Sequence, residues 1–132
     1  MRIYITHCSA TKDARLKDTD TRVTPDRMYT SSRTQKFINR CKEQKVNWAI
    51  LSDKHGIWFP NVKHKWYEKN PNKVTDQEFQ SLVDDFEKKL EPYAEIYFYY
   101  HPGRFHKLYR RLLESVCLKG TIIPFIHLDQ IE

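Results

Sequence analysis

The sequence predicts an α/β fold, a three-layer α/β/α sandwich around a mainly parallel sheet of about four strands. Short apolar runs alternate with segments of helical periodicity, in the order strand, helix, strand, helix, strand, helix, strand. Each helical segment is long enough for a right-handed crossover between parallel strands. The chain has 132 residues, no internal repeat and no low-complexity tract, so we expect a single domain over residues 1–132.

Four runs read as strands. The run that starts at Val46 is almost continuously apolar, which indicates burial on both faces of the sheet. Pro124 lies inside the last run and cannot donate a backbone hydrogen bond there, so that strand is expected at the sheet edge. The predicted strands cover residues 2–6, 46–52, 94–100 and 121–126.

Three segments have the apolar period of helices. Ser32 is predicted to cap the first one in a capping box with Gln35, and Thr75 to cap the second one with Glu78. The third is expected to end at Lys119-Gly120. The first helix covers residues 31–44, the second lies between Thr75 and Pro92, and the third covers residues 104–117. Residues 13–28 and 53–74 are predicted to be long loops.

The composition favours an anionic partner in a reducing compartment. The net charge is +6, from 23 basic and 17 acidic residues, which is typical of proteins that bind nucleic acid or nucleotides and equally of ordinary basic soluble proteins. The three cysteines form no C-x-x-C pair, so we expect neither a zinc ribbon nor a disulfide framework. Free cysteines suit a reducing compartment, and we therefore expect a cytoplasmic location. No secretory signal and no run of membrane-spanning length is present, so no membrane partner is expected.

Polar clusters follow three of the predicted strands. They are "HCSATK" after the first, "SDKHG" after the second and "HPGR" after the third. In parallel α/β sheets, ligands bind outside the carboxyl ends of the strands. The sequence therefore predicts that these clusters converge on one functional site.

The first cluster contains a candidate nucleophile. Cys8 lies near Lys12, and a nearby cation favours the reactive thiolate. Alternatively, Cys8 is a small buried side chain and Ser9 makes a turn hydrogen bond. In a further role, Ser9, Lys12 and the local backbone N–H groups cradle an anion.

The second cluster contains candidate acid–base groups. Asp53 can act as a general base or accept hydrogen bonds from the edge of a nucleobase, and His55 can titrate near neutrality. Gly56 indicates a positive φ or a close backbone approach. The alternative is a simple turn that begins at Asp53.

Two further segments are candidate ligand and phosphate sites. Tyr29, Ser31 and Ser32 stand at a helix start, where free N–H groups and the helix dipole favour anions, although one serine is needed for capping. His101 and Arg104 follow the third strand. A cation at a helix start is mildly unfavourable, which hints that a bound anion compensates for it.

Nucleic acid is the partner suggested by the third helix. Lys107, Arg110 and Arg111 make its outer face basic and can contact phosphates, unless that face is simply solvated. Tyr67 is one of several aromatic residues on which a base can stack, with core packing as the alternative. The six histidines have no metal-binding spacing; a site built from His7, His55 and His101 is geometrically possible, but we predict no metal and no cofactor.

The segments "HCSATK", "MYTSSRTQKFINRC", "WAILSDKHGIWFP" and "KWYEK" resemble a family of uncharacterised bacterial, archaeal and phage proteins. That family has a C-S-x-x-K strand end, an "LSAKYGLL-P" segment and a "PYD"-type motif. The match covers about the first half of the chain. Asp53 and His55 replace a small residue and a tyrosine of the pattern, and "WYE", which ends in Glu68, stands where the family has "PYD".

The first two segments also look like part of archaeosine synthase, and "YYHPGRF" is faintly similar to a motif of uracil-DNA glycosylases. These resemblances imply a Rossmann-like sandwich and a link to nucleobases. Three functions stay open: an enzyme acting on a nucleobase, nucleotide or nucleic acid by a glycosylase-like or base-modifying reaction, a non-catalytic basic nucleic-acid-binding module, and a nucleotide sensor. The sequence predicts no oligomeric state.

Overall fold

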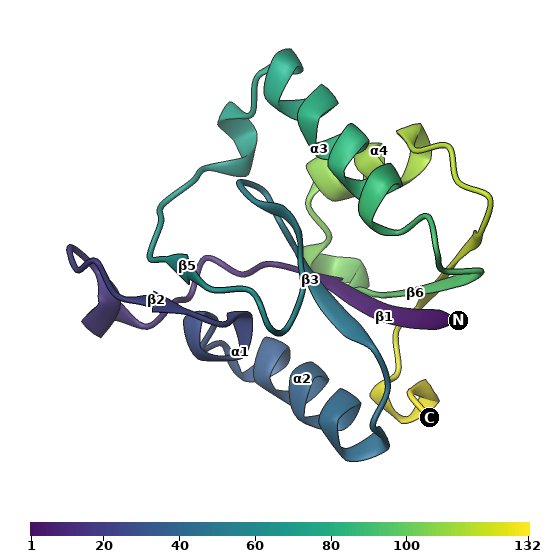
Figure 1. Cartoon of the computed structure of the whole chain (residues 1–132), viewed down its shortest axis with the longest axis horizontal. Coiled ribbons are helices and arrows are strands. Elements are labelled where there is room, and N and C mark those ends of the chain that lie inside the picture. The colour runs from purple at the N-terminus through teal and green to yellow at the C-terminus, as the bar shows by residue number, and fades with distance from the viewer.

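A computed structural model describes residues 1–132. Its centre is a five-stranded sheet, seen in the middle of Figure 1. The strand order is β4-β3-β1-β6-β7, with every neighbouring pair parallel except β3 and β4. The mainly parallel sheet of the predicted fold is therefore confirmed. The strands are β1 (Arg2–His7), β3 (Trp48–Ser52), β4 (Gly56–Trp58), β6 (Glu95–Tyr99) and β7 (Thr121–Phe125).

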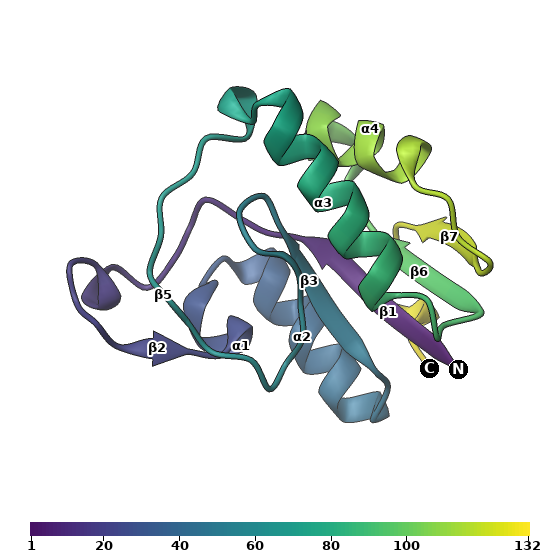
Figure 2. The same cartoon turned by 45° about the horizontal axis from the view of Figure 1, so that its top comes forward.

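Helices cover both faces of this sheet, which makes the predicted three layers. Helix α2 (Ser32–Gln44) lies on one face, while α3 (Asp76–Lys89) and α4 (Lys107–Ser115) lie together on the other (Figure 2). Each helix buries its apolar stripe; in α3 this stripe is Phe79, Leu82, Val83 and Phe86. None of the helices is both long and apolar enough to pass through a bilayer.

The core lies where the sheet meets the helices. Every residue of β3 is buried, as the apolar run predicted, and β1 is buried from Ile3 onward. In β6 the alternation is clear, with Ile96 and Phe98 buried and their neighbours half-buried or exposed. Strand β7 is at the edge, so the interpretation of Pro124 is confirmed.

The two predicted long loops contain short elements that the sequence interpretation missed. Strand β4, an edge strand that was not predicted from the sequence, folds back antiparallel on β3. The short strands β2 and β5 pair with each other. These elements have two to four residues, too few for a readable period. Besides β4 they are η1 (Ala14–Leu16), β2 (Arg22–Val23), α1 (Pro25–Met28), β5 (His64–Lys65) and η2 (Pro71–Lys73). Two further 3₁₀ turns lie in the C-terminal half of the chain, η3 (Pro102–Arg104) and η4 (Leu128–Gln130).

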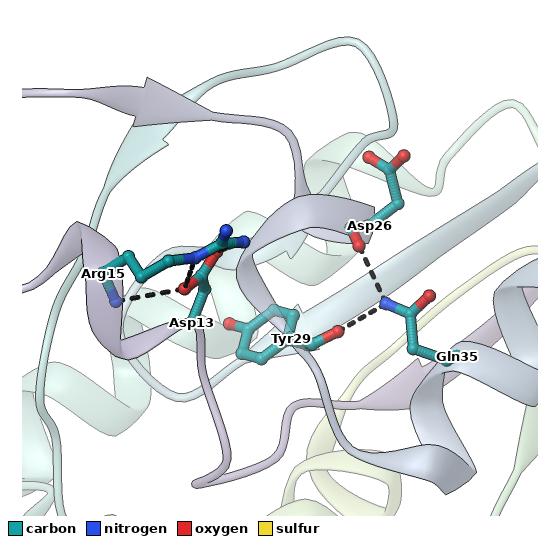
Figure 3. A network of polar contacts seen from close by, with 5 residues as sticks. All are labelled: Asp13, Arg15, Asp26, Tyr29 and Gln35. Atoms are coloured by element: carbon teal, nitrogen blue, oxygen red, sulfur yellow. Dashed lines mark hydrogen bonds and ion pairs between the residues drawn. The ribbon is translucent and has the colours of Figure 1, made fainter.

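The cap of α2 differs from the prediction. Ser31, not Ser32, accepts the hydrogen bond from Thr34 N–H, and the expected capping box with Gln35 is absent. The Gln35 amide instead donates to the backbone carbonyls of Asp26 and Tyr29 (Figure 3). This contact ties α1 and the entry of α2 together, because it satisfies two carbonyls of the preceding loop. The predicted Thr75–Glu78 capping box is confirmed.

The third helix is shorter than expected. After β6 the chain makes the η3 turn, and α4 begins only at Lys107, capped by the His106 side chain. It ends at Ser115, because Val116 turns to extended backbone. Gly120 therefore does not end a helix; a Cβ there would lie 2.3 Å from the Tyr93 carbonyl oxygen, so glycine permits a close backbone approach.

Candidate functional site

A cavity of about 320 Å³ opens at the carboxyl ends of the strands. The chain leaves β1 toward α2 on one face of the sheet and leaves β6 toward α4 on the other, so the two connections diverge and leave a crevice between them. All three predicted polar clusters contribute to its wall. The lining residues are His7, Cys8, Ser9, Ala10, Thr11, Lys12, Ser31, Arg33, Asp53, Lys69, Pro71, Arg104, His106 and Tyr109.

Cys8 is held in a polar but enclosed corner of the cavity. It is 9% exposed, and its sulfur lies 3.0 Å from the Tyr109 hydroxyl and 3.7 Å from the Asp53 carboxylate. Burial and the nearby Asp53 charge raise the pKa of the thiol to about 11. Cys8 is therefore a protonated thiol at neutral pH. This environment disfavours the activated thiolate considered from the sequence.

Asp53 is the only acidic side chain that lines the cavity. It is 5% exposed, and burial raises its pKa above the ordinary value, although Lys12, the Cys8 hydrogen bond and Lys69 act in the opposite direction. A carboxyl group with a raised pKa can exchange protons closer to neutral pH than an exposed one. The geometry therefore fits the acid–base role expected of Asp53.

His7 lines the cavity as a closely packed ring. Its Nδ1 lies 2.9 Å from the Cys8 carbonyl oxygen, and because a carbonyl only accepts, Nδ1 carries the proton. The ring stacks on Tyr109 with 5.0 Å between centroids. Burial and then the Arg33 charge lower the pKa of His7 to about 4, so the ring is neutral. Its Nε2 is buried without a hydrogen-bond partner.

Four cationic side chains also line the cavity. Lys12 lies 4.5 Å from the centre of the Tyr67 ring, and Lys69 makes an ion pair with Glu78. Neither Arg33 nor Arg104 has a carboxylate partner within ion-pair distance, whereas five other pairs exist in the chain. The cationic rim fits the expected anion-binding role of Lys12 and Arg104.

A buried hydrogen-bond chain supports the wall from behind. The Tyr67 hydroxyl contacts the hydroxyls of Tyr29 and Ser52. Ser52 also accepts from the N–H groups of Lys54 and His55, which fixes the turn between β3 and β4. Tyr29 and Tyr67 are almost fully buried and do not line the cavity, so their rings offer no open stacking surface.

His55 and Gly56 lie in a separate shallow hollow against α3. The His55 ring stacks on His64 at 3.8 Å between centroids, and burial followed by His64 lowers its pKa to about 4. Gly56 has φ +70°, and a Cβ there would lie 2.0 Å from Asp85 Oδ2, so both predicted reasons for glycine are present. Asp53 lines both this hollow and the cavity, whereas His55 lines the hollow and not the cavity.

The remaining predicted residues divide between the cavity and the surface. Ser9 lines the cavity and accepts from Thr11 N–H, and Ser31 lines it beside its cap hydrogen bond. Ser32 is exposed outside it. His101 accepts from Gly103 N–H and is also exposed outside it. The predicted nucleic-acid contacts are exposed on α4: Lys107, Arg110 and Arg111.

Sequence reasoning missed Arg33, His106, Tyr109 and Lys69 as members of the site. Arg33 stands two residues after the cap Ser31, so its place at the helix start was a usable signal. Tyr109 precedes the buried Leu112 by about one helical turn and belongs to the inward face of α4. His106 and Lys69 have no comparable signal, because their positions depend on how η2 and α4 pack.

The residues that line the cavity do not form a metal-binding site. No cluster of three or more histidine, cysteine, aspartate or glutamate side chains is arranged to hold a metal ion. His7, His55 and His101 do not meet, since only His7 of the three lines the cavity.

Comparison of the chain with known protein families, curated proteins and solved structures yields no match.

Proposed function

We propose that the protein is an enzyme acting on a nucleobase or nucleotide, with its active site in the cavity at the strand ends. The observation that carries the proposal is the pairing of one buried carboxyl group, Asp53, with a cationic rim in a single cavity. Such a site can hold an anionic group and exchange a proton with the rest of the same ligand. The resemblance to nucleobase-modifying proteins points to the same class of substrate.

Asp53 is the proposed general acid or base. In a glycosylase-like reaction its carboxylate accepts a proton from water while the water oxygen bonds to the sugar C1′. The electrons of the broken C–N bond leave with the base, which takes up the proton that Asp53 received, so the carboxylate is restored. In a base-modifying reaction Asp53 instead moves a proton at the ring edge of the base. Positioned proton transfer of this kind contributes about 10²–10⁴-fold to rate.

Cys8 and Tyr109 have a supporting role in this proposal. Their 3.0 Å contact joins the loop after β1 to α4, and the Cys8 sulfur lies 3.7 Å from Asp53. Because the pKa of the thiol is raised to about 11, Cys8 adds no second negative charge beside the carboxyl group at neutral pH.

The test compares the wild-type protein with Asp53→Asn. Nucleosides, nucleotides and short oligonucleotides are incubated with each, and released or altered bases are separated by chromatography. We expect Asp53→Asn to lose about 10²–10⁴-fold in rate. Asp84→Asn, on the outer face of α3 and outside the cavity, is the matched control and keeps full activity. Equal rates for wild type and Asp53→Asn contradict the assignment.

Stability separates a catalytic loss from unfolding. The pKa of Asp53 is raised by burial, so its ionised form opposes folding, and this cost grows as the pH rises through the folded-state pKa. We therefore expect Asp53→Asn to be at least as stable as wild type at neutral pH. A loss of activity with retained stability then identifies a chemical role.

The second candidate is a non-catalytic nucleic-acid-binding module. What favours it is the exposed basic surface of α4, where Arg110 and Arg111 lie over the rings of Phe105 and Phe79 and have no carboxylate partner. This function requires affinity that falls steeply with salt and weakens when these arginines are neutralised. A nucleotide sensor, in contrast, binds nucleotides through the cavity without turning them over.

A further inference from the structure

Arg33 is fixed at the junction of β1 and β6. Its Nη2 donates to the Thr6 hydroxyl at 3.3 Å, and Thr6 donates in turn to the Tyr99 carbonyl at 2.8 Å. Thr6 and Tyr99 are direct partners in the β1–β6 ladder. The guanidinium group also lies 5.1 Å from the centre of the Tyr99 ring. The side chain is thus held at the diverging point of the sheet rather than free in solvent.

The charge of Arg33 has no counterion. Its Nε is buried without a hydrogen-bond partner, and no carboxylate lies within ion-pair distance. Burial and then the nearby charge of Arg104 lower the pKa of Arg33. Arg33 contacts Tyr99 at the end of β6, and Arg104 follows that strand in η3, so both cations lie at the same end of the cavity. A half-buried charge without a partner is unfavourable unless a ligand neutralises it.

A third group at the same end lacks a partner. The Nε2 atom of His7 is a neutral acceptor, is buried, and belongs to a side chain that is only 7% exposed. Arg33 is close enough to affect the pKa of His7. A ligand at this end must offer negative charge to the arginines.

We propose that Arg33 and Arg104 form the phosphate subsite of the cavity and that its ligand is a nucleoside monophosphate. The inference rests on the proposed function for the nucleoside part, while the phosphate part stands on the arginines. A phosphate monoester carries about −1.5 to −2 charge at neutral pH, which balances two guanidinium groups. A backbone phosphodiester carries a single charge and leaves one arginine unbalanced.

This subsite sets the direction of the ligand. Asp53 follows β3, whereas Arg33 contacts Thr6 of β1 and Tyr99 of β6, so the carboxyl group and Arg33 lie at different strands along the sheet edge. With the phosphate on the arginines, the base points toward Asp53. Planar guanidinium groups can contact a phosphate in the two-pronged manner that lysine cannot reproduce.

Calorimetric titration tests the subsite without any turnover. Adenosine, adenosine 5′-monophosphate, inorganic phosphate and a dinucleotide with an internal phosphodiester are titrated into the intact protein, and the other three ribonucleoside monophosphates follow. We expect the monophosphates to bind and adenosine to bind at least tenfold more weakly. Arg33→Ala and Arg104→Ala each weaken monophosphate binding by roughly ten- to hundredfold, the size of a lost charge-assisted hydrogen bond.

The controls keep the result independent of folding and of the reaction. Arg104 is exposed, so Arg104→Ala is expected to fold normally, and Arg33→Lys keeps the charge but loses the planar contact. Arg110→Ala, on the outer face of α4, leaves binding unchanged. Asp53→Asn retains phosphate binding through the arginines.

Different outcomes separate the two proposals. Equal binding of adenosine and its monophosphate, or unchanged monophosphate binding in both Arg33→Ala and Arg104→Ala, overturns the phosphate subsite. Tighter binding of the dinucleotide than of the monophosphate also overturns it, in favour of a polynucleotide ligand. Arginine-dependent binding of inorganic phosphate together with unaltered bases in the activity test keeps the phosphate subsite and rejects the proposed reaction.

Discussion

The sulfur of Cys8 lies 3.0 Å from the hydroxyl oxygen of Tyr109, and this contact joins the end of β1 to α4 at the wall of the cavity. The two residues are 101 positions apart in the chain. The same sulfur lies 3.7 Å from Asp53, which follows β3. Cys8 therefore connects three elements, and its environment selects a packed, protonated thiol over a reactive one.

Cys8 is predicted to be unreactive toward thiol reagents in the folded protein. Its pKa is raised to about 11 and that of Cys41 to about 12, so almost no thiolate is present at neutral pH, and both side chains are buried. Cys117 is the only exposed cysteine. Ellman's reagent should thus modify one thiol rapidly and the others only after denaturation. Rapid modification of folded Cys117→Ser contradicts this expectation.

Gly56→Ala is predicted to destabilise the hairpin that carries the wall of the site. The left-handed conformation at φ +70° costs a residue with a Cβ about 1–2 kcal/mol. The new methyl group also collides with the Asp85 carboxylate, which accepts from Ile57 N–H at 2.7 Å and pairs with Lys89. Urea unfolding should therefore show a loss of more than 1 kcal/mol.

Gly103→Ala is the matched control for this change. Gly103 has no positive φ, and a Cβ there would come no closer than 3.3 Å to the exposed His101 ring, which can move aside. We expect a change within about 0.5 kcal/mol, the usual range for surface substitutions. Equal effects at the two glycines would show that backbone conformation at Gly56 is not the cause.

The order of strands and helices could be predicted because it depends on local periodicity. The apolar run before Leu51 and the stripe of α3 each repeat over enough residues to identify the element. Strand β4 escaped detection because three residues have no readable period, and only pairing with β3 defines it. Gly120 was misread because its reason is a contact with Tyr93, which is distant in sequence.

The site was predictable where it follows directly from strand ends. Cys8, Lys12 and Asp53 come immediately after strands, and the edge of a parallel sheet gathers such residues. Arg33 and Tyr109 reach the cavity from helices, so their contribution depends on crossover geometry rather than on neighbours in sequence. His55 is two residues from Asp53, but the β3–β4 turn places its side chain outside the cavity, in a hollow that it shares with Asp53.

Ser31 and Ser32 are predicted to differ sharply when replaced by alanine. Ser31 accepts from Thr34 N–H and donates to the Thr34 hydroxyl, whereas Ser32 is exposed and makes no cap hydrogen bond. Ser31→Ala should lower the free energy of unfolding by about 1 kcal/mol, the usual cost of an N-cap. Ser32→Ala should change it by less than about 0.5 kcal/mol. A larger loss in Ser32→Ala than in Ser31→Ala would show that Ser32 caps the helix, as the sequence predicts.

His55 is predicted to make the fold sensitive to mild acid. Its pKa is lowered from 6.5 to about 4 by burial and by the stacked His64, so the unfolded chain takes up this proton first as the pH falls. The stabilisation is complete above pH 6.5 and is lost as the pH falls toward 4. At 1.36 kcal/mol per pKa unit the loss is at most roughly 3 kcal/mol, and solvent at the half-buried ring reduces it.

The measurement is the free energy of unfolding of wild type and His55→Phe across this pH range. Phenylalanine keeps a ring against His64 but takes up no proton, so the difference between the two proteins should shift in favour of the variant as the pH falls. Their difference near pH 8, where both histidines are neutral, isolates the packing change. His7 has a pKa of about 4 as well and lowers stability in the same window in both proteins, so it cancels from the difference. Parallel curves for the two proteins would assign the acid sensitivity to His7 instead of to the His55–His64 pair.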